Sequence, residues 1–166
     1  MAGSVILIGM PGCGKSTCGV LAAKALCKSF LDTDILIQER TGMPLQEIIE
    51  TKGTDFFAET EEAVLSDLAA YTNTVIATGG NAVYYDNAMR HLKSIGRVVY
   101  LKVGFEEMMR RIKNIKTRGI LLAPGETMED LFRRRTVLYE KYADDVIDCD
   151  GTDVEEVVSA ICRTCI

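Results

Sequence analysis

Short runs with high β propensity alternate along the chain with longer stretches in which apolar residues recur at helical spacing. The runs lie at Val5–Ile8, Phe30–Asp34, Val75–Thr78, Val98–Val103 and Asp145–Cys149. Strands that alternate with helices call for a parallel sheet that is covered on both faces. The first helix is predicted over Thr17–Lys28. The pattern therefore predicts an α/β fold of three layers, a five-stranded parallel sheet flanked by helices.

Two stretches look like additions to this core. Gly42–Tyr71 has helical patterning and is too long for a simple crossover, which predicts a helical insertion over about residues 35–71. Lys113–Thr127 is basic and contains glycine, as is typical of a mobile lid, with a plain surface loop as the alternative. A helix is predicted to resume at Thr127, because Asp130 completes a capping pattern with it. The whole chain, residues 1–166, is predicted to form one domain.

Composition and charge exclude several classes of protein. The net charge is −5 and the pI is near 5.0, and no basic run exceeds Arg133-Arg134-Arg135, so we expect no nucleic-acid partner. No apolar stretch approaches the roughly 18 residues of a membrane span, so we expect no membrane partner. The first strand begins within a few residues of the start, which leaves no room for a signal peptide. We therefore expect a cytoplasmic monomer whose partner is a small molecule.

The six cysteines do not form a pattern that demands a metal or a disulfide. Cys162 and Cys165 form a C-x-x-C at the end of the chain, with no second pair nearby and the only histidine, His91, far away in sequence. We interpret the cysteines as reduced, small hydrophobic residues, with a metal or redox role as the less favoured alternative.

The most specific motif lies between the first strand and the first helix. It reads Gly9-Met10-Pro11-Gly12-Cys13-Gly14-Lys15-Ser16-Thr17 and matches the phosphate-binding loop G-x-x-x-x-G-K-[ST]. Its glycines let backbone N–H groups point at a phosphate, Lys15 adds a positive charge, and the Ser16 hydroxyl can bind Mg²⁺. The motif predicts a nucleoside triphosphate, ATP or GTP, bound with Mg²⁺ by Gly9, Gly12, Cys13, Gly14, Lys15, Ser16 and Thr17.

Acidic residues close the second strand. Asp32 and Asp34 stand at i and i+2, so on an extended segment both carboxylates share one face. Beside a phosphate loop, one could hold the water shell of the metal and the other could accept the proton of an acceptor hydroxyl. A plain helix N-cap is the alternative.

Glycines and arginines complete the candidate site. Gly79, Gly80 and Asn81 follow the third strand, where consecutive glycines permit a ligand to approach the backbone, although a tight turn would need them too. Arg118 in the predicted lid and Arg135 on a predicted helix are candidates for binding a transferred phosphate or a substrate carboxylate. Solvated helix charge is the alternative, and it fits Arg133 and Arg134 better.

In this order and spacing, the motifs resemble the shikimate kinase family of phosphate-loop small-molecule kinases. The resemblance covers nearly the whole chain and includes Gly53-x-x-x-Phe57-x-x-x-Glu61, Ala77-Thr78-Gly79-Gly80 and Arg135-x-x-x-Tyr139-Glu140. It implies transfer of the γ-phosphoryl group of ATP to a hydroxyl of a small carboxylate-bearing acceptor, shikimate. It also implies the phosphate-loop kinase fold, with an acceptor-binding insertion and a lid.

The resemblance further implies a role for each matching residue. Lys15, Asp34 and Arg118 would be catalytic, with Lys15 on the phosphates, Asp34 on the acceptor hydroxyl as the base and Arg118 closing over the transferred phosphoryl group. Ser16 and Asp32 would hold the metal, Arg111 would stack on adenine, Gly79 and Gly80 would line the acceptor pocket, and Arg135 would pair with the acceptor carboxylate.

The chain departs from the family pattern mainly at the acceptor pocket. Ala58 stands where an arginine usually grips the acceptor carboxylate, Asn81 stands at the third glycine, and Gly119 replaces the proline after the lid arginine. No arginine lies between Arg40 and Arg90, so a carboxylate acceptor should bind less tightly. A hydroxy-amino acid such as homoserine, bound partly through its ammonium group, is therefore the alternative acceptor, and Asn81 could add an amide hydrogen bond.

Other classes that share the phosphate loop fit the chain less well. A nucleoside monophosphate kinase would need arginines in the insertion to clamp a second phosphate, and a GTPase would need an Asn-Lys-x-Asp guanine reader. A non-catalytic ATP-binding regulator stays open as an alternative, although it would be expected to have lost Lys15, Asp32 or Asp34.

Overall fold

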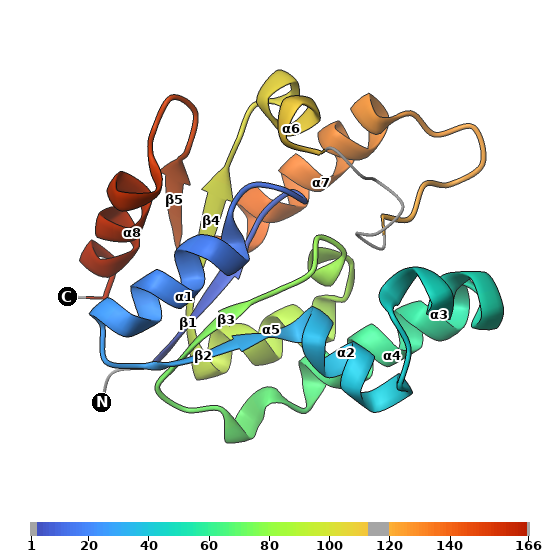
Figure 1. Ribbon diagram of the computed structural model, residues 1–166, viewed down its shortest axis with the longest axis horizontal. Helices are drawn as coiled ribbons and strands as arrows, with labels where there is room; N and C mark the ends of the chain where they lie inside the picture. Colours follow the sequence, from blue (N-terminus) through green and yellow to red (C-terminus); the bar gives the residue numbers. More distant parts are fainter. Residues whose placement is uncertain (1–2, 113–119, 166) are drawn as a thin grey trace.

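The computed structural model describes residues 3–112 and 120–165, and a parallel sheet lies at its centre (Figure 1). The sheet has five strands in the order β2-β3-β1-β4-β5, and every neighbouring pair is parallel. The strands are β1 (Ser4–Ile8), β2 (Ser29–Asp32), β3 (Thr74–Ala77), β4 (Gly96–Lys102) and β5 (Asp145–Asp148). The central strand β1 is buried at all five positions, as expected for a strand covered on both faces.

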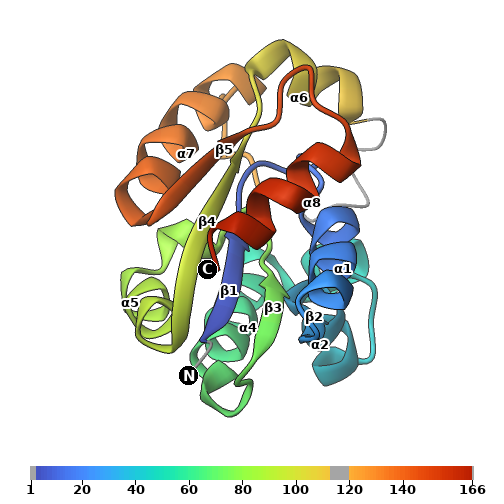
Figure 2. The same ribbon diagram turned by 90° about the vertical axis from the view of Figure 1, so that its left-hand side faces the viewer.

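Helices cover both faces of this sheet, which confirms the predicted three-layer fold (Figure 2). On one face lie α1 (Lys15–Ala25) and α8 (Val154–Arg163), and on the other lie α5 (Asp86–Ile95) and α7 (Met128–Tyr142). The remaining short helices are η1 (Leu68–Ala70), η2 (Ala82–Tyr84) and α6 (Phe105–Arg111). Among the described residues, no helix combines the length and the apolar character that a membrane crossing requires.

Three α-helices, followed by the short η1, stand between β2 and β3, where the sequence predicts the insertion. They are α2 (Thr33–Thr41), α3 (Leu45–Lys52) and α4 (Thr54–Ser66). They enclose a small apolar core of their own, separate from the main core, made of Ile37, Leu45, Ile48, Phe57 and Val64. Leu121, from the segment before α7, packs against this second core. The described end of the predicted lid therefore contacts the insertion.

The sequence-based boundaries need correction, once with a chemical consequence. The predicted strand Phe30–Asp34 ends at Asp32, because Thr33 already begins α2. The Asp32 carboxylate accepts a hydrogen bond from the Asp34 backbone N–H at 2.9 Å, the geometry of a helix N-cap. The spacing predicted that both carboxylates share one face of an extended segment. They do not, because Asp34 already lies in α2.

The first helix begins at Lys15, two residues before its predicted start at Thr17, and ends at Ala25 rather than Lys28. The first strand ends at Ile8 and the last begins at Asp145, as predicted, whereas the remaining ends shift by one or two residues from the predicted Val5–Ile8, Val75–Thr78, Val98–Val103 and Asp145–Cys149.

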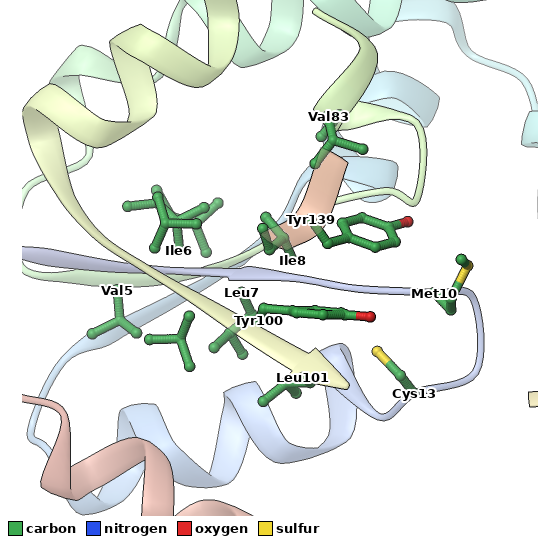
Figure 3. Close-up of a cluster of buried hydrophobic side chains, with 14 of the residues drawn as sticks. Val5, Ile6, Leu7, Ile8, Met10, Cys13, Val83, Tyr100, Leu101 and Tyr139 are labelled. Carbon is green, nitrogen blue, oxygen red and sulfur yellow. The ribbon is translucent and has the colours of Figure 1, made fainter. Parts of the chain in front are cut away.

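The main core includes Met10 and Cys13 of the phosphate loop and packs against that loop (Figure 3). Tyr100 of β4 and Tyr139 of α7 stack with ring centroids 5.1 Å apart, and both point toward the turn that carries Met10 and Cys13. The Tyr139 hydroxyl donates a hydrogen bond to the Gly80 carbonyl at 2.8 Å. The buried Tyr139 side chain thus connects α7 to the glycine turn after β3 and holds that turn in place.

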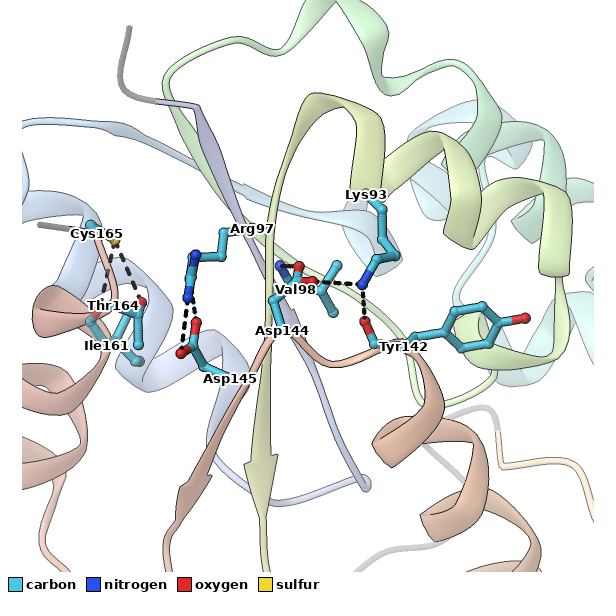
Figure 4. Close-up of polar contacts among 9 residues, drawn as sticks. All are labelled: Lys93, Arg97, Val98, Tyr142, Asp144, Asp145, Ile161, Thr164 and Cys165. Carbon is cyan, nitrogen blue, oxygen red and sulfur yellow. Dashed lines mark hydrogen bonds and ion pairs between the residues drawn. The ribbon is translucent and has the colours of Figure 1, made fainter.

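A polar cluster fixes the C-terminal end of α7 to the sheet (Figure 4). The Lys93 ammonium of α5 donates to the Tyr142 carbonyl at 2.8 Å and to the Asp144 carboxylate at 2.6 Å. The other oxygen of Asp144 accepts the Val98 backbone N–H at 2.9 Å. These bonds join α5, β4 and the start of β5, and they anchor the helix that carries the candidate arginine Arg135.

Candidate active site

The phosphate loop adopts a conformation that its glycines make possible. Gly9, Gly12 and Gly14 have φ values of 149°, 78° and 100°, which side chains rarely adopt. A Cβ atom on Gly9 would lie 2.6 Å from the Leu101 carbonyl oxygen, so the first position also has no room for a side chain. The Lys15 ammonium lies inside the loop and donates to the Gly9 carbonyl at 2.7 Å and to the Met10 carbonyl at 2.9 Å.

The hydroxyl and the acid predicted to hold a metal are in direct contact. The Ser16 hydroxyl, at the N-terminus of α1, donates to the second oxygen of Asp32, at the end of β2, at 2.6 Å. The carboxyl ends of parallel strands lie at one edge of the sheet, which is why residues 16 positions apart meet here. The pair offers two hard oxygen ligands of the kind Mg²⁺ prefers.

One cavity brings the phosphate loop and Asp34 together. Its volume is about 280 Å³, and its lining includes Lys15, Ser16, Asp34, Gly79 and Gly80. It also includes Pro11, Gly12, Gly14, Thr17, Leu45 and Thr78. Of the predicted residues, this cavity therefore brings together Gly12, Gly14, Lys15, Ser16, Thr17, Asp34, Gly79 and Gly80. Gly9, Cys13, Asn81 and Arg135 are not among its lining residues.

Two carboxylates converge on Gly79. A Cβ atom on Gly79 would lie 2.8 Å from Oε2 of Glu61 and 3.0 Å from Oδ1 of Asp34. Those two distances add to 5.8 Å, so the two oxygens are at most that far apart. The Gly79 backbone N–H donates to the Thr33 hydroxyl at 3.2 Å, which ties the glycine turn to the start of α2. The absence of a side chain at Gly79 is what leaves room for both acids beside this residue, and of the two acids Asp34 lines the cavity.

Sequence reasoning missed the role of Glu61, which is 2% exposed. Burial raises the pKa of its carboxyl to about 7, and the Tyr85 hydroxyl, which donates to it at 2.8 Å, counteracts that rise. Nearby Asp34 raises the pKa further. A signal was present in the sequence, because Phe57, Glu61 and Val64 fall on one helical stripe that is otherwise apolar.

Arg135 is buried, with 1% of its surface exposed, under the glycine turn. Its Nη2 donates to the side-chain oxygen of Asn81 in a short hydrogen bond, and its Nε donates to the Tyr84 hydroxyl at 3.1 Å. A Cβ atom on Gly80 would lie 2.5 Å from Nη1. The side chains of Asn81 and Tyr84 therefore hold two nitrogens of the guanidinium group. The third nitrogen, Nη1, lies next to Gly80, which lines the cavity of about 280 Å³.

The other candidate arginines differ in their surroundings. Arg111 lies beside the phosphate loop, since a Cβ atom on Gly12 would lie 3.4 Å from the Arg111 Cβ. It donates to Glu107 at 2.6 Å, and hydrogen bonds from Arg110 and Arg111 lower the pKa of Glu107 to about 2. Its predicted contact with adenine stays a prediction. Arg118 lies outside the described residues.

The two arginines interpreted as solvated charge are not alike. Arg133 is mostly exposed and pairs with Glu129 on the same helix, as expected. Arg134 is half-exposed, pairs with Glu126 at 2.8 Å and lies over the ring of Tyr84 at 5.0 Å from its centroid. Arg134 is therefore an exposed helix charge, as interpreted, and it also contacts the segment before α7 through Glu126.

A second cavity lies where the family pattern has its arginine. Its volume is about 410 Å³, and Ala58, Asn81, Tyr84, Leu121 and Arg134 are among its lining residues. Ala58 and Asn81, the two departures from the family pattern at the acceptor side, thus border the same space. The small side chain of Ala58 leaves that space open.

Comparisons with known proteins place this site in a family. A family model described as shikimate kinase matches residues 11–166. The chain belongs to the shikimate kinase family. A shikimate kinase from Pseudomonas paraeruginosa (strain DSM 24068 / PA7) is 39% identical over 160 residues, which cover 95% of this chain and 93% of the relative. A shikimate kinase from Clostridium botulinum (strain Eklund 17B / Type B) is 35% identical over 161 residues, which cover 97% and 96%.

Solved structures of shikimate kinases have the same fold as this family member. The shikimate kinase from Acinetobacter baumannii in complex with shikimate superposes with a TM-score of 0.90 at 31% identity, covering 99% of this chain and 93% of that one. The enzyme from Aquifex aeolicus gives a TM-score of 0.85 at 35% identity, covering 97% and 95%. The resemblance stated from the motifs is confirmed, and the chain is a kinase, a phosphotransferase with an alcohol group as acceptor.

Proposed function

We propose that this kinase transfers the γ-phosphoryl group of ATP to a hydroxyl group of shikimate. The observation that carries the proposal is the single cavity that holds both the phosphate loop and Asp34, in a chain of the shikimate kinase family. A donor phosphate and an acceptor hydroxyl that bind in one hollow are held for in-line transfer, and such positioning supplies a large part of the acceleration.

The residues present fit ATP and Mg²⁺. The positive φ angles of the loop glycines suit a turn whose N–H groups surround a phosphate, and Lys15 lies within that turn. Ser16 and Asp32 would hold the metal, because they place two hard oxygen ligands side by side. Bound Mg²⁺ would neutralise negative charge on the phosphate oxygens. Lys15 would add positive charge to the same oxygens, which favours the charge distribution of the transition state.

Asp34 and the glycine turn would bind the acceptor. Asp34 would accept a hydrogen bond from the acceptor hydroxyl and orient it, and would take its proton late, because a loose transition state needs little help from a base. Gly79 and Gly80 would let the acceptor approach the backbone. Arg135, held by Asn81 and Tyr84, would attract the acceptor carboxylate.

Other parts of the proposal rest on the family resemblance. Arg118 would close over the transferred phosphoryl group, as part of a lid over about residues 113–127, and Arg111 would stack on adenine. Lid closure would exclude water, which would otherwise compete as the acceptor. The helices between β2 and β3 would act as the acceptor-binding insertion of a single domain over residues 1–166.

The test is an acceptor assay with the purified chain, ATP and Mg²⁺. ADP release is measured with shikimate, with homoserine and without an acceptor, and the product is identified by mass spectrometry. We expect ADP release that depends on shikimate, with a product heavier by one phosphoryl group, and its loss in a Lys15→Ala variant. Phosphorylation of homoserine with no turnover of shikimate would refute the proposed acceptor. Acceptor-independent ADP release alone would refute the kinase assignment.

A further inference from the structure

Two consecutive arginines of α7 meet at the ring of Tyr84. The guanidinium carbon of Arg134 lies 5.0 Å from the centroid of this ring, and that of Arg135 lies 5.4 Å from it. Consecutive residues of an α-helix point about 100° apart, so their side chains do not ordinarily face one neighbour. The Tyr84 ring thus brings two cationic groups together just after the glycine turn.

The two arginines lie at different cavities. Nη1 of Arg135 lies next to Gly80, which lines the cavity of about 280 Å³ that holds the phosphate loop. Arg134 lines the second cavity, of about 410 Å³, together with Ala58 and Asn81. Gly80 and Asn81 are consecutive in the chain, so the two cavities adjoin at the glycine turn after β3.

The charges that line the second cavity favour an anion. Among the described residues that line it, Arg134 is the one with a positive charge. The lining also contains one acid, Asp55, which is exposed, so water weakens its effect. Other parts of the lining are apolar, as at Ala58, Leu121 and Leu122. A charged group of a ligand in this space would therefore find a fixed guanidinium group, which suits a carboxylate best.

Arg134 is held in place and keeps donors for a ligand. Its Nη2 pairs with Oε1 of Glu126 at 2.8 Å, and the other oxygen of Glu126 accepts the Ala123 backbone N–H at 2.9 Å. In the described ranges, 3–112 and 120–165, this ion pair and the Tyr84 ring are the contacts of the guanidinium group. A guanidinium group also carries donors on Nη1 and Nε, and these remain for a ligand.

An acceptor carboxylate at the glycine turn would meet acids as well as arginines. Glu61 and Asp34 both approach Gly79, where a Cβ atom would lie 2.8 and 3.0 Å from their oxygens. Like charges repel, and the repulsion grows where water is excluded. Arg135 is one cation beside these two acids. A second guanidinium group on the same side would offset the repulsion, and Arg134 is the described cation that lines the adjoining cavity.

We propose that Arg134 binds the acceptor carboxylate from the second cavity, together with Arg135, and so sets the preference of this kinase for an acidic acceptor. This inference rests on the proposed function. A carboxylate has two oxygens and can accept hydrogen bonds from two guanidinium groups at once. The small side chain of Ala58 leaves open the space in which this contact forms.

The decisive variant is Arg134→Ala, with Arg133→Ala as the matched control. Arg133 precedes it on α7, pairs with Glu129 and is not among the residues that line the second cavity, so its loss removes the same charge from the same helix. We expect Arg134→Ala to raise the KM for shikimate about tenfold, which corresponds to about 1.4 kcal/mol, with the KM for ATP unchanged. Arg133→Ala should keep both values. Equal KM values for shikimate in the two variants would overturn the inference.

A second variant covers the case in which Arg134→Ala fails to fold. Arg134→Gln keeps a polar side chain at this exposed position and removes only the charge and the planar fork. It should also raise the KM for shikimate, and a parental KM in Arg134→Gln would overturn the inference.

A neutral acceptor shows whether Arg134 acts on the carboxylate itself. In shikimamide, a carboxamide of nearly the same shape replaces the carboxylate of shikimate. The parent should prefer shikimate to shikimamide in kcat/KM, and Arg134→Ala should reduce this preference about tenfold, because the lost contact is made to the charged group. An equal fall in kcat/KM for both acceptors would mean that Arg134 only supports the structure, and it would overturn the inference.

A measurement without turnover separates this inference from the proposed function. Benzoate carries a carboxylate on a six-membered ring and has no hydroxyl group, so it cannot be phosphorylated. Titration of benzoate into the chain labelled with ¹⁵N-arginine should shift the side-chain Nε signal of Arg134, assigned from its loss in Arg134→Ala, and leave that of Arg133 in place. An Arg134 signal that does not move would overturn the inference. If the parent does not phosphorylate shikimate, the proposed acceptor fails, while this titration still decides whether Arg134 binds a carboxylate.

Discussion

The buried carboxyl of Glu61 gives the stability of this kinase a pH dependence that one substitution can isolate. The change is Glu61→Gln, which keeps the size of the side chain and an oxygen for the Tyr85 hydroxyl but removes the titration. In the folded chain, burial raises the pKa of Glu61 from 4.5 to about 7, while the charge of Asp34 raises this pKa and that of Arg135 lowers it. The carboxyl therefore binds a proton more tightly in the folded state than in the unfolded state.

The sign and the size of the effect follow from this difference. A group whose pKa is raised by folding stabilises the folded state fully below its unfolded pKa, and the contribution is lost as the pH rises through the folded pKa. Each pH unit between the two values corresponds to about 1.36 kcal/mol. A rise from 4.5 to about 7 thus predicts a loss of about 3 kcal/mol between pH 4.5 and pH 8. The 2% exposure of Glu61 means that solvent does little to screen it.

Urea unfolding at several pH values measures this contribution. The free energy of unfolding of the parent, minus that of Glu61→Gln, should fall by about 3 kcal/mol between pH 4.5 and pH 8. Taking the difference removes the titration of all other groups. Glu59→Gln, a change at an exposed position on the same helix, is the control and should run parallel to the parent. If the curves of the parent and Glu61→Gln also run parallel, Glu61 is not a buried carboxyl with a raised pKa, and the reasoning is wrong.

Three further substitutions test other parts of the site. Asp34→Asn should lower turnover with shikimate about 100-fold or more and leave the KM for ATP nearly unchanged, as steady-state kinetics will show; undiminished turnover would remove Asp34 from its role. Gly79→Ala should raise the KM for shikimate about tenfold, because the new Cβ would lie 2.8 Å from Glu61 and 3.0 Å from Asp34. Gly3→Ala is the control and should have no effect, because its Cβ would lie 3.6 Å from its nearest neighbour. Equal kinetics in the two alanine variants would contradict the steric argument. Tyr139→Phe should lower the free energy of unfolding by about 1–2 kcal/mol in urea, because the Gly80 carbonyl loses its donor; an unchanged midpoint would show that this bond is dispensable.

Sequence alone determined the features that depend on neighbours along the chain. The phosphate loop, the order of strands and helices, and the capping box of Thr127 and Asp130 follow from residues a few positions apart, and the structure contains all three. The family also followed from the sequence, because its motifs are local and keep their spacing. The one consequential local error was at Asp32, where the same three residues suit both a strand end and a helix cap. The helix is the observed outcome, and it buries Ile37 of α2 in the core of the insertion, against α3 and α4.

Only the tertiary structure showed the network around the acceptor side. Arg135 of α7 meets Asn81 across 54 residues, and Glu61 of α4 meets Tyr85 across 24. Asn81 and Tyr85 flank η2 on either side. No short-range pattern indicates these contacts, because they depend on which faces of three separate elements pack together. The charge state of Glu61 depends on burial in the same way, since its pKa is raised by the removal of water rather than by its sequence neighbours. The sequence therefore indicated the reaction class of this kinase, whereas the tertiary structure determined which side chains contact one another on the acceptor side.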